Sequence, residues 1–357
     1  MIDGACFAVM ALVMCVGMSS FIQNRHMDNP PPFYSVLMQW NEKQERPQQS
    51  DASQDEKRQP AALPPRPALK QETRSWFFLS VFLLVLSIPT MSIADGFLRV
   101  CQTPPGSITT ALWQRLPLSS SSLIYYFVAG FIVHLHIWTV ELFYRVGATT
   151  VLWLLVLINH PTTNGLMGSV YRVTKRFLEQ PPIFDRPWLA HSPYELWSKR
   201  WHQMFRGGFM KLAYQPVRSL FRSKKYAALG RFLAAMAVFL ASGLMHEYVL
   251  VSMVGPSRLA YQQFYKSILG QQVLFFLLQG LSTILTFPGS SLATRFGSKI
   301  PGWLATPLTV LWVVVTAPLF VDPYLRIGLH LEASIPFYPT TFDPYLDIIC
   351  PFGARPL

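Results

Sequence analysis

The sequence predicts an all-α membrane protein that crosses the bilayer about seven times, within a range of six to nine. Only 13% of its 357 residues are charged, while 51% are hydrophobic. The apolar residues are gathered in blocks close to the roughly 20 residues that a helix needs to cross about 30 Å of hydrocarbon. A soluble enzyme would distribute these residues more evenly along the chain, so that class is excluded.

Five of the apolar blocks are long enough to span a membrane, namely 5–22, 76–93, 123–140, 232–254 and 303–321. Two shorter blocks, 146–158 and 273–287, fit tilted spans, spans extended by their flanks, or re-entrant pieces. No basic residue precedes the first block and no convincing cleavage site follows it, so residues 1–22 are expected to be a retained anchor. Residues 23–75 are proline-rich and are expected to form a disordered linker, which leaves 76–357 as the membrane domain.

Positive charge is concentrated in one soluble stretch of the chain. The net charge is +12, and residues 159–231 carry 13 lysines or arginines against three acidic residues. Basic loops usually face the cytosol, so we expect this large loop there. Such a surface suits anionic lipid headgroups or a polyanionic substrate such as coenzyme A. Without any nucleic-acid-binding signature, nucleic acid is not an expected partner.

The four cysteines and a search for common catalytic motifs give little information about function. The cysteines are scattered without short paired spacing, so neither a metal site nor a disulfide framework is predicted. No Gly-x-Ser-x-Gly elbow is present, and none of the eight histidines is followed by aspartate four positions on. A transferase built on this chain would work without an acyl-enzyme, by direct attack of one substrate on the other.

The block 232–254 carries two adjacent ionisable residues, His246 and Glu247. Such residues are costly in hydrocarbon and usually mark a pathway or a reaction, although a histidine satisfied by a neighbouring helix is the alternative. On a helix, neighbours point about 100° apart, so Glu247 should not orient the imidazole. Ser242, one turn earlier, is the expected hydrogen-bond partner, and Gly243 should allow another helix or a ligand to approach closely.

Residues 196–206 have the pattern of a helix lying in the membrane interface. Leu196, Trp197 and Trp201 share one face with Met204 and Phe205, and the opposite face is mostly polar. Such a helix would hold His202 at the boundary between water and lipid, unless it is only an anchor and the histidine is incidental. His134 and His136 also lie in an apolar block, and we expect them to be structural or to line a tunnel.

Three short stretches of the sequence together resemble the wax synthase branch of the membrane-bound O-acyltransferases. They are 181–184 (PPIF), 192–206 (SPYELWSKRWHQMFR) and 242–247 (SGLMHE). The resemblance covers 181–321, and elsewhere only the hydropathy agrees. It implies a helical membrane fold with an intramembrane tunnel, a catalytic histidine at His246 and acyl-CoA as donor. The position of His202 is often asparagine in the wider superfamily, so both a catalytic and a positioning role are compatible with it.

Chemistry then assigns the expected roles. A neutral His246 would remove the proton of an alcohol as it attacks the thioester, with His202 assisting near the developing oxyanion. Lys199, Arg200 and Arg206 are the expected ligands of the CoA phosphates, and neither a bound cofactor nor a metal is required. The fungal members that the chain resembles acetylate terpenoids or meroterpenoids of secondary metabolism, which favours acetyl-CoA and an endoplasmic reticulum location.

Three alternatives stay open from the sequence. A long-chain fatty alcohol as acceptor would make the protein a wax ester synthase. A transporter could also place histidine and glutamate in a span, although the matched halves and paired broken helices of transporters are not found here. A non-catalytic membrane scaffold would fit the hydropathy as well.

Overall fold

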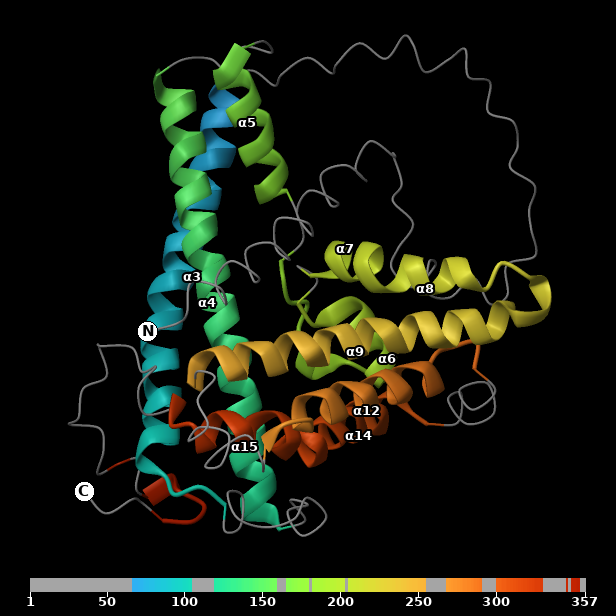
Figure 1. Ribbon diagram of the computed structural model, residues 1–357. Coiled ribbons are helices and arrows are strands. Elements are labelled where there is room, and N and C mark those ends of the chain that lie inside the picture. Colours follow the sequence, from blue (N-terminus) through green and yellow to red (C-terminus); the bar gives the residue numbers. More distant parts are fainter. Residues whose placement is uncertain are drawn as a thin grey trace. The chain divides into compact units, whose positions relative to one another are not determined.

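The computed structural model describes residues 66–104, 119–158, 165–179, 182–202, 205–254, 268–290, 300–329, 345 and 348–353 (Figure 1). Within these ranges the regular structure is helical and contains no strand, as predicted. The predicted anchor 1–22 and most of the linker 23–75 lie outside the described residues. The chain divides into two compact units, one built around 92–133 and 183–357 and the other around 41–91 and 134–182.

Four stretches of the described chain are helices long and apolar enough to cross a membrane, judged by length and composition. They are Arg74–Val100 within α3 (Arg66–Val100), Ser120–Leu157 within α4 (Ser120–Ile158), Lys224–Met253, which contains most of α9 (Ala227–Val254), and Gly302–Arg326, which contains α14 (Gly302–Thr316) and α15 (Pro318–Arg326). A shorter apolar helix, α12, covers Gln271–Leu285. Many large apolar side chains on α3 and α4 are exposed, which is typical of helices that face lipid.

The block 146–158 does not form a separate span, because α4 runs through it without a break from the preceding block. The polar residues that separate the two blocks in the sequence neutralise each other on the helix. Glu141 accepts a hydrogen bond from Arg145 at 2.8 Å, and the two are one turn apart. At the N-terminal boundary of the predicted membrane domain, which was expected at residue 76, helix α3 begins ten residues earlier, at Arg66.

The unit built around 41–91 and 134–182 has its own small core. α5 (Gly165–Leu178) contributes Tyr171 and Leu178, which pack against Leu152 and Val156 of α4. His134 belongs to this unit, where it is buried and its ring stacks on Trp138. These contacts favour the structural role for His134.

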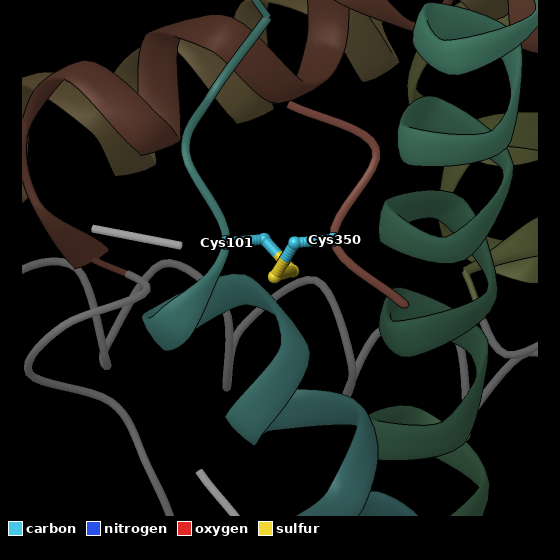
Figure 2. Close-up of a disulfide and its surroundings, with 2 residues drawn as sticks. All are labelled: Cys101 and Cys350. Carbon is cyan, nitrogen blue, oxygen red and sulfur yellow. A yellow bond between two sulfur atoms is a disulfide. The ribbon is translucent and has the colours of Figure 1, made fainter. Parts of the chain in front are cut away.

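A disulfide joins Cys101, directly after α3, to Cys350 near the end of the chain (Figure 2). The S–S distance is 2.09 Å across a sequence separation of 249 residues, and Gln102 donates its backbone N–H to the carbonyl of Gly353 beside it. The spacing of the cysteines did not predict this disulfide. A pairing between single cysteines at opposite ends of a domain leaves no spacing signal in the sequence.

Helices α9 and α12 run side by side and pack through a close approach (Figure 1). A Cβ atom added to Gly243 would lie 2.7 Å from the Cα atom of Val273, so only glycine fits there. From the other side, Gly280 of α12 receives the ring of Phe239. The prediction that Gly243 admits a second helix is confirmed.

Candidate active site

His246 of α9 lies among aromatic side chains of α12 and α15. Its imidazole stacks on Phe276, with ring centroids 4.9 Å apart and planes at 15°, and meets the ring of Phe320 edge-to-face at 5.1 Å. Its Nδ1 atom is 3.3 Å from the hydroxyl oxygen of Tyr324. Tyr324, rather than the predicted Ser242, is thus the hydrogen-bond partner of the imidazole among the described residues. A long-range contact from α15 replaces the local one because the imidazole points into the helix packing.

Glu247 contacts the start of helix α12 instead of the imidazole. Its carboxylate accepts a hydrogen bond from the backbone N–H of Gln272 at 3.0 Å, and the backbone groups of Gly270 and Val273 are also close to it. A carboxylate at a helix N-terminus satisfies otherwise unpaired N–H groups and interacts favourably with the helix dipole. The predicted separation of Glu247 from the imidazole is confirmed, and Glu247 instead fixes the start of α12.

The expected interfacial helix over 196–206 is not continuous. The chain forms α6 (Pro193–Glu195), then a π-helical turn, η5 (Leu196–Arg200), then extended backbone at Trp201, and it resumes as α7 (Arg206–Phe209). The periodic pattern was misread because its aromatic face packs on other helices of the same unit instead of lying along a membrane surface.

Trp197 shows this packing most clearly. Its indole N–H donates to the Oε1 atom of Gln279 at 3.2 Å, and that oxygen also accepts from Trp312 at 3.0 Å. The amide nitrogen of Gln279 donates to Thr316 at 2.8 Å. Gln279 is fully buried with these three hydrogen bonds made, which a buried amide requires. The turn η5 is therefore tied to both α12 and α14.

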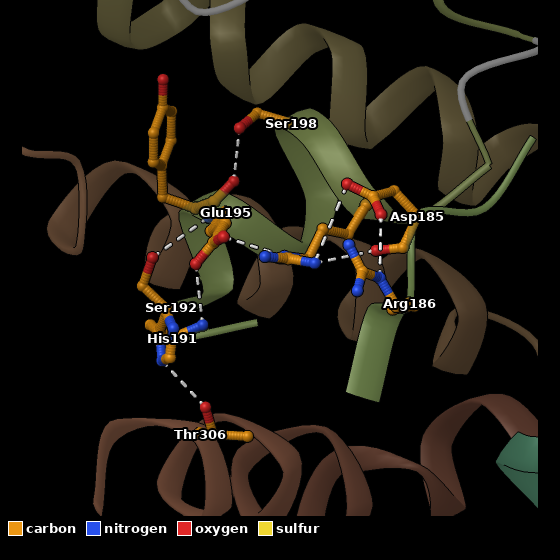
Figure 3. A network of polar contacts seen from close by, with 9 residues as sticks. Asp185, Arg186, His191, Ser192, Glu195, Ser198 and Thr306 are labelled. Carbon is orange, nitrogen blue, oxygen red and sulfur yellow. Dashed lines mark hydrogen bonds and ion pairs between the residues drawn. The ribbon is translucent and has the colours of Figure 1, made fainter. Parts of the chain in front are cut away.

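A polar network holds the loop around η5 (Figure 3). Glu195 accepts from the backbone N–H of His191 and from the Nε atom of Arg200, both at 2.8 Å, while its own N–H donates to Ser192. Burial raises the pKa of the Glu195 carboxyl, but these two hydrogen bonds outweigh it and hold the pKa below its ordinary value. Glu195 is therefore charged at neutral pH.

The three cations predicted to bind the CoA phosphates have different surroundings. Arg200 is engaged in the network, since it also donates to the backbone carbonyl of Asp185 at 3.0 Å and its guanidinium lies 3.8 Å from that residue's carboxylate. Arg206 is half-buried, and burial lowers its pKa to about 10, partly offset by Tyr194. Lys199 is exposed. Of the three, Lys199 offers the most accessible charge and Arg200 stabilises the loop.

His202 follows the extended residue Trp201 and is surrounded by rings. Its imidazole lies 5.9 Å from the ring of Phe184, 5.7 Å from Trp201 and 5.5 Å from Phe205, and its Nδ1 atom is buried. Burial lowers the pKa of His202 to about 4, with its own backbone acting in the opposite direction. The ring is therefore neutral at physiological pH.

The two histidines belong to one aromatic cluster in the same unit. Trp201 contacts Trp197 at 5.6 Å, Trp197 contacts Phe276 at 6.3 Å, and Phe276 stacks on His246. The structure thus brings together the two residues that the sequence singled out, although 44 positions separate them.

Three residues of this region escaped the sequence reasoning. Tyr324 and Gln279 carry no signal on their own, because a tyrosine or a glutamine at a span end is common. Asp322 could have been found as an ionisable residue at the end of an apolar block. It is buried and accepts a hydrogen bond from the hydroxyl of Tyr126 at 2.7 Å.

Fold and site together define a helical membrane protein with a half-buried histidine among aromatic rings. Residues 180–278, which hold both histidines, match the membrane bound O-acyl transferase family. Over this segment the chain is similar to that family and resembles its wax synthase-like branch. No solved structure matches the chain.

Curated relatives from Arabidopsis thaliana are similar over part of the chain. The chain is 28% identical over 157 residues to Probable long-chain-alcohol O-fatty-acyltransferase 9 and 31% identical over 160 residues to Probable long-chain-alcohol O-fatty-acyltransferase 1. It is 30% identical over 158 residues to Acyl-CoA--sterol O-acyltransferase 1. These matches cover 42–44% of this chain, and the chain spans 41–42% of the length of these relatives.

Proposed function

We propose that the protein is an O-acyltransferase that moves an acyl group from acyl-CoA to the hydroxyl of a hydrophobic alcohol, with His246 as general base. The observation that carries this proposal is the placement of His246 within an apolar helix, in the matched segment, against aromatic rings and one hydroxyl. An imidazole in such surroundings is costly unless it has a function. The names of the relatives support the reaction class.

The chemistry follows from a neutral imidazole. As the alcohol oxygen attacks the thioester carbonyl, the Nε2 atom of His246 takes the hydroxyl proton, an effect worth about 10²- to 10⁴-fold in rate. Collapse of the tetrahedral intermediate forms the ester and breaks the carbon–sulfur bond. The thiolate of CoA leaves and receives the proton back from the imidazolium. Apolar surroundings keep out water, which would otherwise hydrolyse the thioester.

His202 and the exposed cation near it have supporting roles in this proposal. A neutral His202 can donate one hydrogen bond to the developing oxyanion, and its place in the same aromatic cluster supports that role. Lys199 would contact the CoA phosphates from the cytosolic side, with Arg206 nearby in sequence as a second cation.

For the substrates, we propose acetyl-CoA as donor and a terpenoid or meroterpenoid alcohol as acceptor. The resemblance to fungal acetyltransferases supports this choice. The relatives named for long-chain alcohols and a sterol support the alternative, a fatty acyl donor with a long-chain alcohol or a sterol. Both alternatives use the same base and the same leaving group, so they differ in what fills the apolar site.

We also propose an orientation for a multi-pass protein of the endoplasmic reticulum membrane. Disulfides persist in oxidising compartments, which supports a lumenal position for the pair Cys101–Cys350 and the end of α3. A short connection of 18 residues leads from Cys101 to the start of α4, so α4 would begin on that side and end on the opposite one. The basic segment 159–231 would then be cytosolic, in agreement with the positive-inside rule.

The test uses microsomes that carry the full chain, labelled acetyl-CoA or a longer acyl-CoA, and a panel of terpenoid, sterol and long-chain alcohols. We expect ester formation with the wild type and none with His246→Ala at equal membrane content. The control is His191→Ala, which alters an exposed histidine bonded to Thr306 at 2.9 Å. Near-normal turnover by His246→Ala would remove the catalytic role, and uptake of an unmodified solute without any ester would favour a transporter.

A further inference from the structure

The aromatic side chains around His246 leave its two ring nitrogens in different environments. Phe276 covers one face of the imidazole and Phe320 meets it edge-to-face. The Nδ1 atom faces the hydroxyl of Tyr324 at 3.3 Å, and that contact is the hydrogen bond made by this ring to the described residues. The Nε2 atom is therefore the one available to a substrate.

Packing fixes Tyr324 in place independently of this hydrogen bond. Its ring lies 5.5 Å from that of Phe320, one turn earlier on α15, and packs against the buried residues Leu250 and Ile268. Leu250 lies one turn after His246 on α9, so the same two helices hold both partners of the hydrogen bond. The hydroxyl thus reaches Nδ1 from a ring that cannot easily turn away.

We propose that Tyr324 is a positioning residue that keeps the proton of neutral His246 on Nδ1 and so leaves the lone pair of Nε2 for the attacking hydroxyl. This inference rests on the proposed function. A phenol oxygen can accept a hydrogen bond from one neighbour while it donates its own proton to another. When Nε2 takes the proton from the alcohol, the imidazolium continues to donate from Nδ1 to the same oxygen, which stabilises the new charge.

Tyr324→Phe tests this inference in the full chain, because it removes the hydroxyl and keeps the ring and its packing. We expect kcat to fall about 10- to 100-fold, less than the 10²- to 10⁴-fold that a general base itself contributes, while the KM values of both substrates stay within about twofold. The matched control is Tyr125→Phe, which removes a hydroxyl from a buried tyrosine of the same unit, one that packs against Phe97 and Phe352. Equal kcat values for wild type and Tyr324→Phe would overturn the proposal.

A second measurement does not depend on activity. In protein labelled with ¹⁵N-histidine, the ring signals that disappear in His246→Ala belong to this imidazole, and their chemical shifts report which nitrogen carries the proton. We expect the Nδ1–H tautomer in the wild type and a mixture of tautomers in Tyr324→Phe. A wild-type ring protonated on Nε2 would overturn the proposal. Absence of transfer by the wild type, with the Nδ1–H tautomer present, would instead count against the proposed function alone.

Discussion

Two neighbouring ionisable residues, His246 and Glu247, lie on one membrane helix and interact with different partners. The imidazole contacts Phe276, Phe320 and Tyr324, while the carboxylate accepts a hydrogen bond from the start of α12. A difference of about 100° around the helix is enough to produce this division. The adjacency of the two residues in the sequence therefore does not indicate a catalytic pair.

Glu247→Gln should affect stability more than chemistry. Glutamine keeps an oxygen that can accept from Gln272, but it loses the charge that interacts with the α12 dipole, a loss of about 0.3–2 kcal/mol. We expect a lower thermal stability in detergent and a kcat within about tenfold of the wild type, against the complete loss in His246→Ala. Equal losses of activity in both variants, with normal folding, would show that the carboxylate takes part in the reaction.

Lys199→Gln separates a phosphate contact from general attraction to lipid. Because Lys199 is exposed and Arg200 is engaged with Glu195, the single lysine variant tests binding without damaging the loop. We expect the KM for acyl-CoA to rise a few-fold, with kcat and the KM for the alcohol unchanged, as for the loss of a charge-assisted contact of about 1 kcal/mol. Lys225→Gln, another exposed lysine of the same basic segment, is the control. Identical behaviour of the two variants would favour the lipid interpretation.

Among the helices, the close approach of α9 to α12 determines the shape of the site. Gly243 places its backbone against Val273, and Phe276, one turn further along α12, covers the imidazole. Glu247 fixes the start of the same helix. Helix α12 is therefore the element that links the base, its aromatic cover and, through Gln279, the turn η5 that precedes His202.

Gly243→Ala should separate these two helices. The added Cβ would lie 2.7 Å from a backbone atom, which cannot move without shifting α12, and overpacking of this kind costs about 1–3 kcal/mol. We expect lower thermal stability together with lower kcat, since Phe276 and His246 would move apart. Gly130→Ala is the control, because its Cβ would meet nothing within 4 Å and alanine favours a helix. Equal stability of both variants would contradict the packing argument.

The sequence predicted these elements to different degrees. Long apolar blocks predicted α3, α9 and the span that includes α14, because hydrophobic length is a local property. The break expected between 140 and 146 is absent. Glu141 and Arg145 lie one turn apart and form an ion pair, so the helix can continue through these charged residues. His246 and Gly243 were found from local sequence alone. Tyr324 and Gln279 were not, because their roles depend on contacts between helices that are distant in sequence.

For the whole molecule, the disulfide and the charge distribution independently support the proposed orientation in the membrane. The pair Cys101–Cys350 indicates an oxidising compartment at the end of α3, and the net charge of +10 over 159–231 indicates the cytosol beyond the end of α4. With one crossing by α3, the linker 23–75 would also be cytosolic.

Thiol labelling in sealed microsomes can test this orientation on the full chain, in a background where Cys6 and Cys15 are changed to serine. While the disulfide is intact, a membrane-impermeant maleimide should label neither Cys101 nor Cys350. After reduction, labelling should require permeabilised microsomes, because both thiols would face the lumen. Lys225→Cys adds a thiol in the basic segment and should be labelled in intact microsomes. Labelling of Cys101 and Cys350 in intact microsomes would reverse the orientation, and labelling without reduction would show that the disulfide does not form in the membrane.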